Sequence, residues 1–257
     1  MHRALTEIAH RPWPMPSGPW IMSQSWRDLL FAHWPIDASH LRALIPAALD
    51  IDTFQGAAWI GVVPFRMAGV RLRATPPLPG LSAFPELNVR TYVTHGDKPG
   101  VWFFSLDAAN GIAVSIARSW FHLPYFNARM RCENRNGWIE YDSERTHRSA
   151  TKAKLRMRYR PAGEVFHPQL STLEYFLTER YCLYAADGKG KISRGEIQHA
   201  PWPLQPAEAE FRENTMTNIL ERGAPAPLLR TTPHHPGLPL LHFSRCQDVV
   251  VWHPHAI

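Results

Sequence analysis

Glu86-Leu-Asn-Val-Arg-Thr-Tyr-Val93 is the stretch of sequence that decides the fold. Its even positions are Glu, Asn, Arg and Tyr, and its odd positions are Leu, Val, Thr and Val. A period of two is typical of a β-strand, because successive side chains of a strand point to opposite faces of its sheet. The stretch therefore predicts a strand with one polar face. That face either meets water, as in most alternating strands, or lines a pocket.

Similar short strands are expected on both sides of this one. Turn signals separate several of them, and Asn136-Gly137 is a strong signal for a β-hairpin because both residue types tolerate a positive φ. The expected strands cover residues 26–34, 51–54, 57–66, 101–106, 129–133, 137–142, 151–160 and 240–252.

Few segments have a helical pattern. The main one is 108–121, which Asp107 can cap and which Leu123-Pro124 would end. The other helices are expected at residues 39–45, after a cap at Asp37 or Ser39, and at residues 173–181 and 206–220. Many short strands with few helices predict an α+β protein built on a closed or nearly closed antiparallel β-barrel.

Proline is concentrated near the start of the chain. Residues 11–20 contain four prolines and a glycine, which is typical of an extended arm rather than of regular structure. We find no repeat and no linker in the sequence that follows. We therefore expect a proline-rich arm over residues 1–23 and a single domain over residues 24–257.

Composition limits the class of protein. The chain of 257 residues is 45% hydrophobic, which is enough for a sizeable core and excludes global disorder. Cys132, Cys182 and Cys246 are far apart and odd in number, so they indicate no disulfide framework. No window is apolar enough to span a bilayer, and the N-terminus lacks the core of a signal peptide. These features predict a soluble, cytoplasmic protein.

The net charge of +6 comes almost wholly from arginine, and the densest basic pattern lies in residues 152–160. Three interpretations of that pattern are open: a solvated sheet face, the lining of an anion-binding lumen, or a contact with nucleic acid. Nucleic acid is the least favoured, because no zinc-finger spacing or RNA-binding signature accompanies the charge. The basic residues that share one face of the expected strand are Lys152, Lys154, Arg156, Arg158 and Arg160.

Neither a cofactor nor a metal is expected from the motifs. The sequence has no phosphate-cradling glycine loop and no Gly-x-Ser-x-Gly nucleophile elbow. None of its 14 histidines has zinc-binding spacing on a helix. Whether His33, His199 and His242 meet in the fold is left open.

Several segments carry a resemblance to known proteins, at residues 29–37, 52–65, 84–93, 177–184, 199–205 and 241–245. Together they are similar to the YqjF-like family of uncharacterised bacterial proteins, which is grouped with the acetoacetate decarboxylase-like superfamily. The resemblance spans about residues 24–252. It implies a cone-like β-barrel with a ligand pocket inside, and self-association.

The same resemblance bears on chemistry. In the decarboxylases, an Arg, a Trp and a Pro at closely similar spacing lead into a Lys-Lys pair, and the first lysine forms a Schiff base with the substrate. In this chain Pro124 is followed by Tyr125 and Phe126, neither of which can form an imine. Decarboxylation through a Schiff base is therefore predicted to be absent.

Glu86 and Tyr125 are the candidate catalytic residues. Glu86 can act as an acid or base once removed from water, whereas Tyr125 either donates a hydrogen bond to a ligand carbonyl or is a buried structural tyrosine. Arg90 can hold a carboxylate through two parallel hydrogen bonds. The other candidate ligand-binding residues are Asn88 and Tyr92 on the same strand face, His33 near the position where the decarboxylases carry an arginine, and Arg118 and His122 on the helix, with Arg118 alternatively a structural ion-pair partner.

The sequence thus predicts a protein that binds a small organic acid or a carbonyl compound. As an enzyme it would use acid–base chemistry of a lyase, hydratase or isomerase type, without a lysine nucleophile. The alternative is a non-catalytic ligand-binding or sensor module on the same barrel.

Overall fold

The computed structural model describes residues 2–148, 150–221 and 238–257. Its helical elements are α1 (Ala38–Arg42), α2 (Gly111–Phe121) and α3 (Leu173–Thr178), with 3-10 turns η1 (Arg3–Leu5) and η2 (Met216–Glu221). Its strands are β1 (Met22–Ile36), β2 (Asp50–Ile51), β3 (Ala58–Leu72), β4 (Phe84–His95), β5 (Lys98–Ala108), β6 (Tyr125–Arg135), β7 (Trp138–Arg145), β8 (Lys154–Pro161), β9 (Cys182–Ala186), β10 (Ile192–Gln198), β11 (Gln205–Asn214), β12 (Leu240–Val251) and β13 (His255–Ala256).

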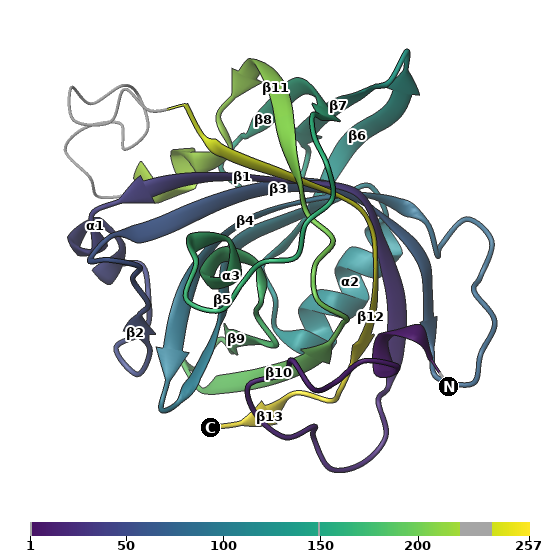
Figure 1. Ribbon diagram of the computed structural model, residues 1–257. Coiled ribbons are helices and arrows are strands. Elements are labelled where there is room, and N and C mark those ends of the chain that lie inside the picture. Colours follow the sequence, from purple (N-terminus) through teal and green to yellow (C-terminus); the bar gives the residue numbers. More distant parts are fainter. Residues whose placement is uncertain (1, 149, 222–237) are drawn as a thin grey trace.

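The strands form two closed rings that share one wall, made of β12, β1, β3, β4 and β5 (Figure 1). β9 and β10 complete the smaller ring by joining β5 to β12. The strands β6, β7, β8 and β11 complete a nine-stranded ring over the other side of the wall. The predicted barrel with few helices is confirmed.

One detail of that prediction needs correction, because the barrel is mixed rather than antiparallel. β5 pairs in parallel with both β6 and β9. A parallel pair needs a long crossover connection, and α2 supplies it between β5 and β6. The crossover places α2 against the smaller ring.

The shared wall explains why β4 is buried on both faces. Its odd residues Leu87, Val89 and Val93 pack in the core of the nine-stranded ring, beside residues of β7 and β8. Its even residues turn towards the smaller ring and are also buried, with Glu86 only 2% exposed and Arg90 9% exposed. The polar face of β4 therefore points inward.

A β-bulge at Asp28 lets β1 contribute inward-facing side chains to both rings. Asp28 has a positive φ of 50°, and the register with β3 shifts across it. Trp26 before the bulge and Leu29 after it both line the smaller ring, although they are an odd number of positions, three, apart. The bulge thus changes whether the even-numbered or the odd-numbered residues of β1 face the inside of the smaller ring.

Local turn chemistry follows the sequence in several places. Asp37 caps α1 by accepting a hydrogen bond of 2.8 Å from the Ser39 amide. Asn136 and Gly137 have φ values of 51° and 83° in the hairpin between β6 and β7. These positions confirm the predicted cap and turn.

Two predicted helices differ from the structure. The segment 206–220 was expected to be helical because alanine and glutamate favour helices, but residues 205–214 form β11. Its alternation of exposed and half-buried residues places the glutamates opposite the basic residues of β8. Earlier in the chain, α2 starts later than predicted, because Asn110 rather than Asp107 caps it. The Asn110 Oδ1 accepts hydrogen bonds of 3.1 Å from two amides.

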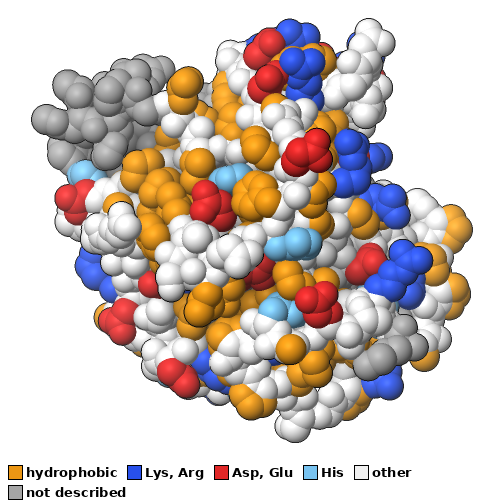
Figure 2. All heavy atoms as spheres, in the orientation of Figure 1, with side chains coloured by type: hydrophobic (Ala, Val, Ile, Leu, Met, Phe, Trp, Pro, Cys, Tyr) orange, Lys and Arg blue, Asp and Glu red, His pale blue; other side chains and the backbone are white. Residues whose placement is uncertain are grey.

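The basic residues of β8 lie on the outer face of the nine-stranded ring. Arg158 and Arg160 form ion pairs of 2.7 Å with Glu210 and Glu208 of β11. Acidic and basic side chains are interleaved at the top of the molecule in Figure 2, where Figure 1 places β8 and β11. The structure thus places these residues on a charged sheet surface and not in a lumen.

Candidate functional site

A cavity of about 660 Å³ lies inside the smaller ring. Phe84, Glu86, Asn88 and Arg90, at alternate positions of β4, all line it. A strand rises by about 3.3 Å per residue, so these four positions extend along roughly 20 Å of wall. Most of the remaining wall is apolar and includes Trp26, Leu29, Phe65, Met67, Phe103 and Phe121.

Glu86 and Tyr125 form a buried pair in this cavity. The Tyr125 hydroxyl donates a hydrogen bond of 3.0 Å to Oε2 of Glu86. Burial raises the pKa of Glu86 to about 8; the hydrogen bond from Tyr125 lowers it and the charge of Asp107 raises it. Glu86 is therefore mostly protonated at neutral pH. A neutral carboxyl group in such a place can donate a proton or a hydrogen bond to a bound carbonyl.

Arg90 belongs to a second polar group at the other end of the row. Its Nη2 donates to the Tyr92 hydroxyl at 3.2 Å and to the Leu177 carbonyl at 3.1 Å. The Tyr92 hydroxyl in turn donates to Leu177 at 2.8 Å and lies 2.6 Å from Nε2 of His33. Burial, together with the charge of Arg90, holds the pKa of His33 well below its usual range, so the ring is neutral. Tyr92 and His33 thus fix the direction of the guanidinium.

Some buried polar atoms of these residues have no partner among the described residues. They are Nε of Arg90 and Oδ1 of Asn88, and Asn88 is 6% exposed. Buried polar groups are nearly always hydrogen-bonded in native proteins, because leaving one unsatisfied costs about 1–3 kcal/mol. Arg90 and Asn88 both line the cavity and have hydrogen-bonding capacity that their protein neighbours do not use, so these two side chains are suited to contact a ligand.

The structure separates the remaining predicted residues from the cavity. His33 and Tyr92 lie behind Arg90 and do not line the wall. Arg118 is exposed and donates to the Tyr125 carbonyl at 2.7 Å, while His122 ends α2 with a φ of 53°. Both border a different hollow, beside Phe126. Arg118 and His122 thus lie outside the cavity that contains Glu86 and Tyr125.

Other lining residues were not predicted. Gln24, Arg180, His199 and Trp202 contribute to the cavity wall. Arg180 is committed elsewhere, because its Nη1 pairs with Asp52 at 2.6 Å. Because of the bulge in β1, a simple alternation pattern does not show that Gln24 faces the same cavity as Leu29. His199 and Trp202 lie in an irregular segment, which has no periodic pattern to indicate their direction.

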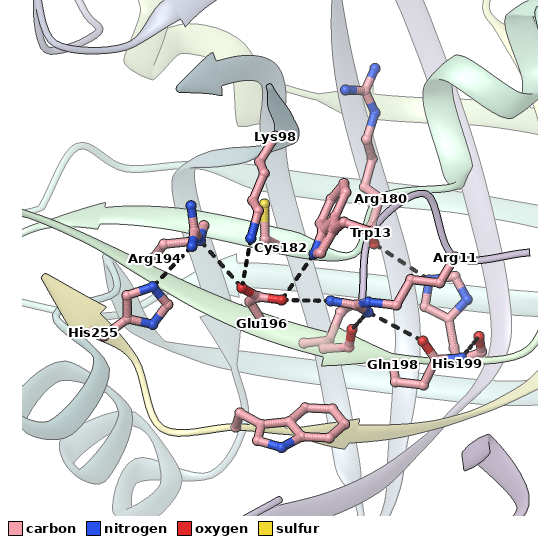
Figure 3. A network of polar contacts seen from close by, with 12 residues as sticks. Arg11, Trp13, Lys98, Arg180, Cys182, Arg194, Glu196, Gln198, His199 and His255 are labelled. Atoms are coloured by element: carbon pink, nitrogen blue, oxygen red, sulfur yellow. Dashed lines mark hydrogen bonds and ion pairs between the residues drawn. The ribbon is translucent and has the colours of Figure 1, made fainter. Parts of the chain in front are cut away.

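The N-terminal arm is fastened to strand β10 of the smaller ring (Figure 3). Glu196 of β10 accepts from Arg11 at 2.6 Å and from the Trp13 indole at 3.0 Å. Lys98 and Arg194 approach the same carboxylate at 3.6 and 3.4 Å. The pKa of Glu196 is lowered because these cations and the indole outweigh the opposing effect of its burial. The arm is therefore part of the folded unit.

Within the described residues, no group of three or more His, Cys, Asp or Glu side chains could hold a metal ion. None of the helices described here is long and apolar enough to cross a membrane.

Comparison with known proteins shows which family the chain belongs to. A family model described as an uncharacterized conserved protein matches residues 23–248. The uncharacterized protein YqjF of Bacillus subtilis (strain 168) is 46% identical over 238 residues, which cover 93% of each chain. This relative confirms the resemblance seen in the sequence segments.

Solved structures share the fold at low identity. The enduracididine biosynthesis enzyme MppR complexed with pyruvate has a TM-score of 0.58 at 11% identity, covering 96% of this chain and 93% of that chain. Acetoacetate decarboxylase from Legionella pneumophila has a TM-score of 0.57 at 12% identity, covering 97% and 93%. An acetoacetate decarboxylase-like enzyme from Sphingomonas wittichii RW1 has a TM-score of 0.58 at 14% identity, covering 96% and 97%. The chain therefore belongs to the YqjF-like family of uncharacterized conserved proteins and has an acetoacetate decarboxylase-like fold.

Proposed function

We propose that the protein binds an organic acid or a carbonyl compound in the cavity of the smaller ring. The observation that carries the proposal is the buried row on β4, where Glu86, Asn88 and Arg90 place polar side chains in an otherwise apolar cavity wall. Pockets with this balance, mostly apolar with a few placed polar groups, are typical small-molecule sites. Arg90 would hold the carboxylate, and Asn88 would contact the next polar atom of the ligand.

The pair of Glu86 and Tyr125 supports proton transfer as the reaction. A protonated Glu86 would donate to a carbonyl oxygen of the ligand and afterwards accept a proton as its conjugate base. Tyr125, whose pKa is raised well above its usual value by burial and by Glu86, stays neutral and keeps Glu86 oriented. Lyase, hydratase or isomerase reactions of a carbonyl compound can use such an acid–base group without forming an imine.

Binding at Arg90 can be tested by thermal denaturation with a panel of keto, hydroxy and unsaturated acids. A ligand at about 100 times its dissociation constant stabilises the folded state by roughly 2.7 kcal/mol, which raises the melting temperature measurably. We expect this shift in the natural protein and its loss in Arg90→Ala. Arg158→Ala, on the outer sheet, is the control and should keep the shift. If Arg90→Ala responds to every acid as the natural protein does, the proposed site is wrong.

Borohydride reduction tests the chemistry separately. The described cavity wall contains no lysine, so we expect no covalent adduct when the protein is reduced in the presence of a keto acid such as pyruvate. Intact-mass measurement would detect an adduct. A trapped adduct on any lysine would overturn a reaction without an imine.

A non-catalytic binding or sensor role is the second function supported here. It is favoured by Tyr125, which by the sequence resemblance stands where the decarboxylases carry their lysine and cannot itself form an imine. Acids that bind through Arg90 but show no turnover would support this role over catalysis. We also propose a cytoplasmic location, in keeping with the three free cysteines, Cys132, Cys182 and Cys246.

A further inference from the structure

We infer that the ligand is an elongated carboxylic acid with a long apolar chain. Its carboxylate lies at Arg90, and its chain runs along β4 past the pair of Glu86 and Tyr125 to an apolar mouth beside α2. This inference rests on the proposed function, because it uses the same contact with Arg90.

The two polar groups of the cavity are too far apart for a small acid. Arg90 and Glu86 are four residues apart on one face of β4, which is about 13 Å along the strand. The guanidinium also leans away from Glu86, because its Nη2 donates to Tyr92 and Leu177. A ligand of the size of pyruvate held at Arg90 would not reach Glu86. A ligand that contacts both must be long.

The wall beyond Glu86 has the chemistry of an acyl-chain site. Phe65 and Met67 of β3 and Phe84 of β4 continue the lining from Glu86 towards the start of β4. Phe65, Met67 and Phe84 belong to one buried apolar cluster, which also contains Phe121 of α2. Such a surface gains free energy by covering methylene groups and offers nothing to a second polar group.

The mouth of the cavity is mainly apolar as well, although Arg71, Thr75 and Ser82 also line it. It lies between the loop joining β3 to β4 and helix α2, where Leu78, Ile112 and Trp120 line the cavity while being 58%, 57% and 41% exposed. Asn110 ties the two sides together, because its Nδ2 donates to the Leu81 carbonyl at 3.2 Å. Clustered exposed apolar side chains usually mark a binding surface. An entrance of this kind suits an apolar chain better than a small hydrophilic acid.

Chain length provides the test. The dissociation constants of butanoate, octanoate, dodecanoate and hexadecanoate would be measured by calorimetry below the concentrations at which they form micelles. Each buried methylene tightens binding about fourfold, so octanoate should bind about 200 times more tightly than butanoate. Methyl dodecanoate, which lacks the charge, should bind more weakly than dodecanoate.

Substitutions on α2 separate the chain site from the carboxylate site. Ala117→Trp places an indole in the cavity wall and should remove most of the gain from chain length while leaving butanoate binding intact. Ala113→Trp, one turn earlier on the same face, is a second variant in case the first folds poorly. Ser115→Trp is the matched control, because Ser115 is exposed on the opposite side of the helix and outside the cavity wall.

The outcomes distinguish the two proposals. Affinity that rises with chain length, falls in Ala117→Trp and depends on Arg90 for the acids supports both. Arg90-dependent binding that is the same for butanoate and dodecanoate overturns the long-chain ligand and leaves the acid site standing. Tight binding of dodecanoate and its methyl ester alike, unchanged in Arg90→Ala, overturns the carboxylate contact and with it the orientation inferred here.

Discussion

Glu86→Gln is expected to remove a loss of stability that the natural protein suffers as the pH rises from 4.5 to about 8. Burial raises the pKa of Glu86 from 4.5 to about 8 in the folded chain. Below pH 4.5 the group is protonated in both states. Between these values the folded chain keeps a proton that the unfolded chain releases, so the free energy of unfolding falls by about 1.4 kcal/mol per pH unit.

Chemical denaturation at a series of pH values would measure this effect. The difference in unfolding free energy between Glu86→Gln and the natural protein should increase from pH 5 to pH 8 by several kcal/mol and level off above that. Asp107, whose pKa is raised to about 6 by burial against the opposing effect of Arg145, also titrates in this window but is present in both proteins. Tyr125→Phe removes a hydrogen bond that lowers the pKa of Glu86, so this pKa should rise further in the variant. The unfolding free energy of Tyr125→Phe should therefore go on falling to a higher pH than that of the natural protein. Parallel profiles for Glu86→Gln and the natural protein would show that Glu86 is not shifted.

Asp107→Ala is expected to lower the free energy of unfolding by about 3–5 kcal/mol at neutral pH. Asp107 of β5 and Arg145 of β7 form an ion pair of 2.8 Å with side chains 0% and 1% exposed. Removing one partner leaves a buried guanidinium without its counter-charge, which is far more costly than losing an exposed pair. The pair lies next to the parallel junction of β5 and β6, where Asp107 is opposite Phe126.

The control for this prediction is Glu210→Ala. It breaks a pair of similar length, 2.7 Å to Arg158, on the outer sheet. Solvent competes with exposed pairs, so this change should affect the denaturation midpoint little. If Asp107→Ala and Glu210→Ala shift the denaturation midpoint equally, the stability of the protein does not depend on the buried ion pair beside the junction of β5 and β6.

The architecture and the row of polar residues on β4 could be predicted from the sequence, but not whether that row faces the inside of the barrel or the solvent. Alternation on β4 identified the strand and the shared face of Glu86, Asn88 and Arg90. It could not tell inward from outward, because the opposite face is buried in a second ring and alternation only separates polar from apolar. A strand shared by two rings has no exposed side to mark the outside.

Errors at other elements also have physical causes. Residues 205–214 combine strong helix formers with a period of two, and pairing with the basic strand β8 outweighed their helix propensity. Asp107 was a reasonable helix cap, yet its ion pair with Arg145 keeps it in β5 and leaves the cap to Asn110. Arg118 was placed correctly on the helix, but the direction of its side chain depends on tertiary packing that a single sequence does not contain.

The two-sided burial of β4 also bears on how such a protein can change over evolutionary time. Substitutions at positions 84, 86, 88 and 90 alter the wall of the cavity, whereas positions 87, 89 and 93 maintain the core on the other side. Cavity lining and core packing are thereby assigned to alternate residues of a single strand. Proteins with the same barrel can therefore change the chemistry of the cavity through one set of alternate residues while keeping the other unchanged.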